Sequence, residues 1–134
     1  MSKTTGVEVR PVESAEAAVR GSHVVNVITK ASEPVLKGDW LEPGQHVNAA
    51  GSNALTRREI DDAVVKKCDV IVVDGRGTAR NECGDLLSAG LTSTPVAFDI
   101  FSQKATSLSL LRAKTLTVLI FLTRHTASSW LIPW

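Results

Sequence analysis

One stretch of the sequence has the residue order of a phosphate-binding turn. Residues 70–87 (VIVVDGRGTARNECGDLL) run from a β-branched strand into Gly75-x-Gly77 and then into a predicted helix. A dinucleotide turn needs a third glycine so that the helix can pack closely on the strand, but Arg80 occupies that position. Asp74 would also repel a pyrophosphate, because it places a carboxylate directly before the turn. We therefore interpret Gly75 and Gly77 as turn glycines and not as a dinucleotide fingerprint.

Small or polar residues follow three predicted strands, at the points where parallel sheets usually bind ligands. They are Thr29-Lys30, the run Ala50-Gly51-Ser52-Asn53, and Asp74-Gly75. Any α/β sheet has turns at these points, so this pattern alone supports a binding site and ordinary turns about equally.

These strand ends depend on elements that alternate between strand and helix. Strands are predicted at residues 7–12, 23–28, 45–50 and 68–74, and helices at residues 15–20, 57–67 and 78–87. Ser14 is a typical N-cap and Gly21 a typical helix stop, whereas Pro11 confines the first strand to a sheet edge. Residues 33–42 are predicted to form a loop with one helical turn. The pattern predicts an α/β fold with a mostly parallel sheet that is covered on both faces.

Charge and cysteine content exclude several classes of function. The 134 residues carry a formal net charge of +1, which gives no electrostatic signature of a nucleic acid or an acidic membrane as partner. Cys68 and Cys83 match no zinc spacing, and we predict no metal site. No apolar run is long enough to span a membrane. We therefore expect a soluble, cytoplasmic protein with reduced cysteines.

The composition changes after Gly90. Asp99 is the one carboxylate side chain in residues 91–134, whereas Ser, Thr and Leu become frequent there. We divide the chain into a domain of residues 1–90 and a tail of residues 91–134, for which we expect irregular or helical structure. A shifted reading frame and natural divergence would both explain the change.

Residues 33–65 (EPVLKGDWLEPGQHVNAAGSNALTRREIDDAVV) carry a specific set of motifs. The strings W-L-x-P-G-x-H-V-N-A-x-G and R-E-[IL]-D-D are followed by E-C-G-D-L, in that order. With these motifs, residues 6–87 resemble the ornithine cyclodeaminase/mu-crystallin family. The resemblance implies an enzyme that binds NAD or NADP in a Rossmann domain and acts on small amino or imino acids. The name-giving enzymes convert ornithine to proline and ammonia, and relatives reduce cyclic imines.

The resemblance also implies that parts of the domain are missing. The family's glycine fingerprint lies in the first Rossmann strand, and this chain would begin near the third strand. In the 3-2-1-4-5-6 strand order, the strands at residues 7–12 and 23–28 would each lose a neighbour. The family is usually homodimeric, but its dimer-forming region would lie upstream. We therefore predict a partial Rossmann-like domain that lacks its first strands, a fragment that is inactive alone.

Several residues carry over from the family to this sequence as cofactor-binding positions. Thr29 ends a strand beside the cofactor, and Gly51 allows the backbone to approach it closely. Arg57 lies where a basic side chain would reach the cofactor. The strand end along the nicotinamide half consists of Val47, Asn48, Ala49 and Ala50.

Asn53 occupies the catalytic position at which ornithine cyclodeaminases have an aspartate for proton transfer. An asparagine cannot take up a proton at neutral pH, so this departure favours cyclic imine reduction over ornithine deamination. Two other interpretations stay open, namely a non-enzymatic nucleotide or small-ligand binding module of mu-crystallin type and an unstable remnant. NAD and NADP are not distinguished, because the selecting residue would lie at the end of the missing second strand.

Overall fold

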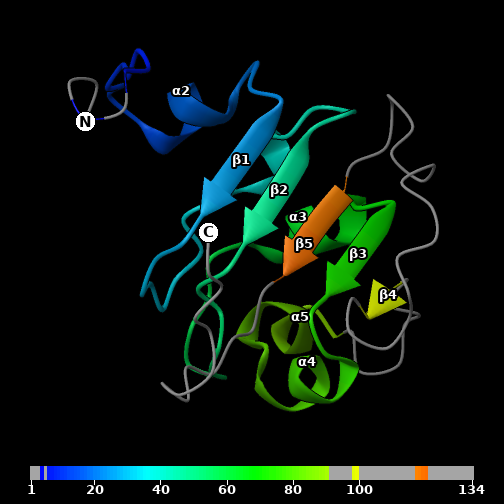
Figure 1. The fold of residues 1–134 in the computed structure, drawn as a ribbon. Helices are drawn as coiled ribbons and strands as arrows, with labels where there is room; N and C mark the ends of the chain where they lie inside the picture. The colour runs from blue at the N-terminus through cyan, green and yellow to red at the C-terminus, as the bar shows by residue number, and fades with distance from the viewer. Residues whose placement is uncertain (1–3, 5, 91–97, 100–116, 121–134) are drawn as a thin grey trace, which may run out of the picture.

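A five-stranded parallel sheet forms the centre of the molecule (Figure 1). The computed structural model describes residues 4, 6–90, 98–99 and 117–120. The strands are β1 (Val24–Val27), β2 (His46–Ala49), β3 (Val70–Val73), β4 (Phe98–Asp99) and β5 (Thr117–Ile120). They lie in the order β1-β2-β5-β3-β4, and all the pairings are parallel. The predicted mostly parallel α/β sheet is therefore confirmed.

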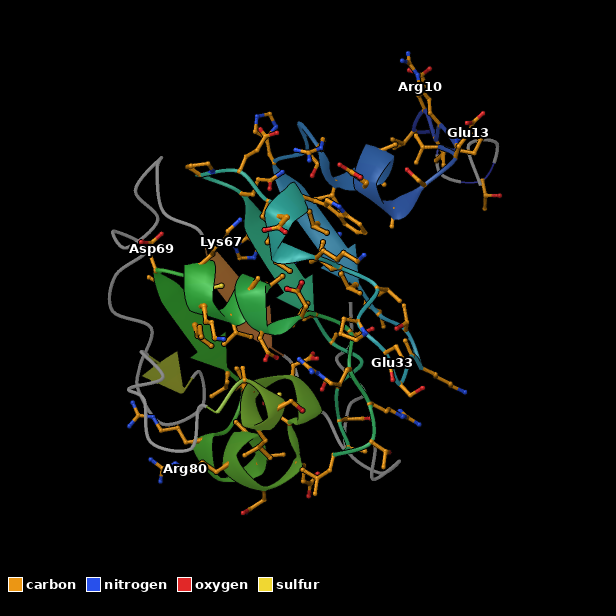
Figure 2. The ribbon with its side chains drawn as sticks, turned by 180° about the vertical axis from the view of Figure 1, so that it is seen from behind. Arg10, Glu13, Glu33, Lys67, Asp69 and Arg80 are labelled. Carbon is orange, nitrogen blue, oxygen red and sulfur yellow. The ribbon has the colours of Figure 1, made fainter. Side chains whose placement is uncertain are left out.

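Short helices lie on one face of the sheet and at its carboxyl end. The helices are α2 (Ala15–Val19), the 3-10 helix η1 (Gly38–Trp40), α3 (Asp62–Lys67), α4 (Arg76–Glu82) and α5 (Gly84–Ser88). Figure 2 shows α3 on the near side of the sheet, where it packs against η1 and α5. α4 and α5 lie beyond the arrowheads of β5 and β3 in Figure 1, at the carboxyl ends of those strands.

Capping side chains decide where two of the helices begin. Ser14 caps α2 by accepting a hydrogen bond from Ala17 N at 3.1 Å, as the sequence predicts. Asp61 caps α3 by accepting from Val64 N at 2.9 Å, and the same oxygen accepts from Gly38 N at 3.0 Å. Asp61 therefore ties η1 to the start of α3.

Side chains of the strands alternate between two faces of the sheet. The covered face, which packs in one core with Val64 and Val65 of α3, consists of Val27, Val47, Ala49 and Val73. Further buried members of this core are Val19, Leu36, Leu41, Ile60, Ala79, Cys83 and Leu86. On the opposite face of β1 and β2, here called the open face, lie Val24, Asn26, His46 and Asn48, of which Val24 is 53% exposed. The prediction that both faces are covered is therefore wrong for the described part of β1.

The predicted strand at residues 7–12 is wrong. These residues are irregular, and Val7, Val9 and Val12 are 64%, 47% and 53% exposed. Within the described part of the chain, β1 forms a ladder with β2 alone. Pro11 lacks a backbone N–H, and residues 7–12 form no regular strand.

Two predicted helices have different boundaries in the structure. The helix predicted at residues 57–67 begins at Asp62, because Asp61 caps it and Ile60 instead forms a parallel bridge with Leu36. The helix predicted at residues 78–87 is two helices that meet at Cys83, and the first of them begins at Arg76. Gly77 therefore lies within α4 and is not a turn residue.

The expectation of an irregular or helical tail is wrong where the tail is described. Residues 98–99 form β4, and residues 117–120 form β5, which lies between β2 and β3. The apolar, β-branched sequence TVLI of β5 is typical of a strand in the centre of a parallel sheet. Other residues of the predicted tail lie outside the described part of the chain.

Candidate functional site

The carboxyl ends of β1 and β2 lie side by side. Their register pairs Val27 with Ala49, and Ala50 N continues the ladder by donating to Val27 O at 2.9 Å. Beyond the ladder, Thr29 follows β1 with an exposed side chain, and Gly51 follows β2. Two of the predicted cofactor-binding residues are thus brought together at one edge of the sheet.

A buried glutamate joins these two strand ends. Oε1 of Glu59 accepts a hydrogen bond from Thr29 N, and Oε2 accepts one from Gly51 N. Glu59 is 0% exposed, so its carboxylate lies within the fold. Hydrogen bonds from backbone N–H groups to a carboxylate are stronger than those between neutral groups. Glu59 therefore fixes how far apart the two ends lie.

The backbone of Glu59 is held on both sides. Its carbonyl oxygen accepts from Val35 N and Leu36 N, each at 3.0 Å. Its N–H donates to Oδ1 of Asp85 at 2.9 Å, and Ile60 N donates to the same oxygen at 3.2 Å. The backbone that carries the Glu59 side chain is thus held in place by hydrogen bonds on both sides.

Asp85 is the second fully buried carboxylate of this region. Its own N–H donates to Ser52 Oγ at 2.9 Å, and Ser52 Oγ donates to Arg57 O at 2.9 Å. Burial raises the pKa of Asp85 to about 6, while the hydrogen bonds from the Glu59 and Ile60 N–H groups lower it. Among the described residues, Oδ2 of Asp85 has no hydrogen-bond partner. The loop after β2 is therefore connected to α5 through Ser52 and Asp85.

Two glycines in this region have no room for a side chain. A Cβ on Gly51 would collide with the carbonyl oxygen of Thr29 and the carboxylate of Glu59. A Cβ on Gly84 would lie 2.8 Å from Ala54 O and would also collide with Arg57 O. Close approach of protein atoms therefore requires glycine at both positions, and the predicted contact of Gly51 with the cofactor stays a prediction.

Asn53 and Arg57 form a pair on the loop after β2. Arg57 Nη1 donates to Asn53 Oδ1 at 2.8 Å, and both side chains are half-buried. The amide oxygen of Asn53 is thus occupied by a cation. The predicted catalytic position and one predicted cofactor-binding residue therefore contact each other directly.

The remaining predicted cofactor-binding residues are distributed over both faces of β2 and the loop after it. Val47 and Ala49 are fully buried in the core, which leaves their side chains no free surface. Asn48 and Ala50 are half-buried. Asn48 Nδ2 donates to Asn26 Oδ1 at 2.7 Å, and His46 Nε2 lies 2.9 Å from Asn48 Oδ1. These three side chains form a polar row across the open face.

Glu59 and Asp85 were not recognised from the sequence as parts of the site, and Ser52 was noted only as one of the polar residues after a predicted strand. A helix starting at Arg57 would place Glu59 among helical acids that the helix dipole stabilises. The run Asp61-Asp62-Ala63 contains the missed signal, because Asp61 as N-cap would begin the helix at residue 62 and leave Glu59 in a loop. No local signal in the sequence marks the contact of Asp85 with Glu59.

Other kinds of chemistry find no support in the described residues. Burial raises the pKa of the Cys68 thiol to about 12 and that of Cys83 to about 11, so neither is activated as a nucleophile. Within the described ranges, no group of three or more His, Cys, Asp or Glu side chains could hold a metal ion. No helix in the same part of the chain is long and apolar enough to cross a membrane.

Comparison with protein families gives a match over most of the chain. The family described as the ornithine cyclodeaminase/mu-crystallin family matches residues 1–104. The matched range extends on both sides beyond residues 6–87, over which the sequence motifs indicated the resemblance. The domain boundary at residue 90 stays a prediction.

Individual relatives agree with the family match. The ketimine reductase mu-crystallin of Rattus norvegicus is 42% identical over 96 residues, which are 72% of this chain and 28% of the relative. A solved structure of Thermococcus litoralis Δ1-pyrroline-2-carboxylate reductase, in complex with NADH and L-proline, is similar with a TM-score of 0.73 and 29% identity. It is matched over 91% of this chain and 39% of its own.

A second solved structure supports the fold. The probable ornithine cyclodeaminase of Bordetella pertussis Tohama I has a TM-score of 0.76 at 21% identity, over 91% of this chain and 40% of its own. The chain thus spans less than half the length of each relative named here. These comparisons confirm the predicted Rossmann-like fold and the predicted family.

Proposed function

Because the chain belongs to the ornithine cyclodeaminase/mu-crystallin family, we propose that it forms part of the cofactor-binding domain of an NAD(P)-dependent reductase of cyclic imino acids. One observation carries the proposal. The carboxyl ends of β1 and β2 lie side by side and are joined by Glu59 at the edge where parallel sheets bind ligands. A relative at 29% identity has NADH and L-proline bound.

The residues at this edge fit a nicotinamide cofactor. Ala50 is half-buried and adds only a methyl group, so a flat ring can approach this strand end closely. Gly51, which follows it, is buried against the Glu59 carboxylate and the Thr29 carbonyl oxygen. Thr29 is exposed beside this strand end, and its hydroxyl, which accepts from Ala31 N at 3.2 Å, can donate its O–H to a ligand. The bound cofactor would supply the hydride, while Thr29 and Ala50 would hold and orient it.

Asn53 favours imine reduction over ornithine deamination. Its Oδ1 already accepts from Arg57 at 2.8 Å, and an amide neither gives nor takes a proton at neutral pH. Deamination of ornithine needs proton transfers to and from two amines, which a carboxylate at this position would serve. The matched relatives named ketimine reductase and Δ1-pyrroline-2-carboxylate reductase support the same choice.

A binding module without turnover is the second candidate. The 134 residues contain no G-x-G-x-x-G run for the pyrophosphate. We therefore expect this chain alone to bind the nicotinamide end of the cofactor weakly and to lack turnover.

For the whole protein we further propose a homodimer that is cytoplasmic and acts on a small amino or imino acid.

Thermal unfolding of the 134-residue chain with and without excess NADH tests the proposal. A transition temperature that rises with NADH concentration is expected, because a ligand that binds the native state stabilises it. AMP at the same concentration is the control, since it lacks the nicotinamide. A transition that does not respond to NADH would overturn the proposal. Oxidation of NADH on addition of Δ1-pyrroline-2-carboxylate would instead overturn the expectation of no turnover.

A further inference from the structure

We infer that Glu59 is a positioning residue for the proposed cofactor site, and the inference rests on that proposed function. Its carboxylate holds the backbone of Thr29 and Gly51, the two residues that project beyond the β1–β2 ladder. Neither sequence motif nor helix capping requires this contact. Glu59 acts through those residues and does not itself reach the ligand, because it is fully buried.

The ladder itself does not depend on Glu59. Ala50 N donates to Val27 O at 2.9 Å and so closes the last regular rung. Gly51 lies one residue beyond Ala50 and Thr29 lies two residues beyond Val27, and their N–H groups bond to Glu59. Glu59 therefore orders Thr29, which would contact the cofactor, and Gly51, which follows Ala50 at the same edge. The sheet behind them is held by its own hydrogen bonds.

The chemistry of the contact requires a carboxylate. Two backbone N–H groups point at one side-chain terminus, so both of its oxygens must accept. A glutamine at this position would offer one acceptor and one donor, and its NH₂ group would face an N–H. One of the two strand ends would then be released while the volume of the side chain stays the same.

The backbone of Glu59 is held in place, so the length of the Glu59 side chain sets the spacing of the two strand ends. The Glu59 carbonyl oxygen is held by Val35 N and Leu36 N, and its N–H is held by Asp85 Oδ1. Asp61, two residues later, is instead the N-cap of α3. Glu59 is thus the acid of the R-E-I-D-D motif that faces the strand ends.

The test compares three variants of the 134-residue chain by amide hydrogen exchange and by NADH titration. Glu59→Gln removes one acceptor, and Glu59→Asp keeps the charge but is one methylene shorter. Glu13→Gln is the matched control, because Glu13 is exposed and lies at the end of the molecule opposite α4 and α5 in Figure 2. Exchange is followed at the Thr29, Gly51 and Ala50 amides.

We expect Glu59→Gln to speed exchange at Thr29 or Gly51 by about tenfold or more, while Ala50 stays protected. We also expect the dissociation constant for NADH to rise by about tenfold, the effect of one lost hydrogen bond to a charged group. Glu13→Gln should change neither value. Protection at Ala50 shows that the sheet is intact, which separates loss of positioning from loss of folding.

Each other outcome has a distinct meaning. Wild-type affinity for NADH with released amides in Glu59→Gln would overturn the positioning role and leave the proposed function standing. Absence of NADH binding by the wild type would overturn the proposed function, and the positioning role for the cofactor with it. If Glu59→Gln does not fold, Glu59→Asp decides, because unchanged exchange and affinity in that variant would overturn the inference.

Discussion

On the covered face of β2, Val47 and Ala49 are fully buried, whereas on the open face of the same strand His46 and Asn48 are half-buried and lie 2.9 Å apart through their polar atoms. The covered face is apolar and packs against α3. The open face of β1 and β2 combines a polar row with the exposed Val24. In the described structure, the covered face is therefore stabilised by close apolar packing and the open face by hydrogen bonds. Substitutions on the two faces should differ in how much they lower the free energy of unfolding.

The largest effect is expected in the core beneath the covered face. Leu36 is 2% exposed, and Leu36→Ala should lower the free energy of unfolding by about 3 kcal/mol through lost burial and a cavity. Urea denaturation followed by circular dichroism measures this. A loss below about 1 kcal/mol would mean that this side is no better packed than the open face.

A smaller, pH-dependent effect is expected from Asp85, the buried acid next to the core. Burial raises its pKa to about 6 from 3.8, so between these values the native state binds more protons than the unfolded state. Stability from this group is therefore present at low pH and is lost as pH rises through 6. Asp85→Asn removes the effect.

The measurement is the free energy of unfolding of Asp85→Asn minus that of the wild type. This difference should increase between pH 4 and pH 7, by on the order of 2 kcal/mol. Glu13→Gln, at an exposed carboxylate, is the control for surface titration. A difference that stays constant over this pH range would contradict the prediction.

On the open face, the polar row should contribute less. Asn48→Ala removes the contacts with both Asn26 and His46 and should cost about 1 kcal/mol. Asn26→Ala, the matched variant, removes one of these contacts and should cost about half as much. If Asn48→Ala and Asn26→Ala lower the free energy of unfolding equally in urea denaturation, the three side chains do not form a connected network.

The smallest effect is expected at Val24 on the open face. Because its side chain is 53% exposed, Val24→Ala should change the free energy of unfolding by less than about 0.5 kcal/mol. Val27→Ala on the same strand, where the side chain is 7% exposed, should cost about 2 kcal/mol. Similar losses for both variants would show that the open face is buried in solution.

Local sequence patterns predicted the strands that line the site. Runs of valine around residues 24–27 and 70–73 and the H-V-N-A segment indicated β1, β3 and β2, and Ser14 indicated the start of α2. These features depend on residues that are neighbours in the chain. The family motifs further identified Gly51, whose lack of a side chain is explained by its contact with Glu59.

Contacts between distant residues were not predictable in this way. Glu59 contacts Thr29, which is 30 residues away, and its N–H bonds to Asp85, which is 26 residues away. Residues 7–12 have a strand-like sequence, but the described sheet offers them no ladder. The position of β5 between β2 and β3 likewise depends on a pairing that no local pattern contains.

The position of β5 has a consequence for how the chain folds. β2, α3 and β3 follow one another in sequence, yet β2 and β3 reach their full pairing only when residues 117–120 fill the space between them. The centre of the sheet is thus completed by a segment that leaves the ribosome after β1, β2, β3 and β4. Such pairings over long sequence separations raise the contact order and slow folding. A nascent chain that stops before residue 117 would leave one side of β2 and of β3 unpaired, where chaperones and other strands can bind.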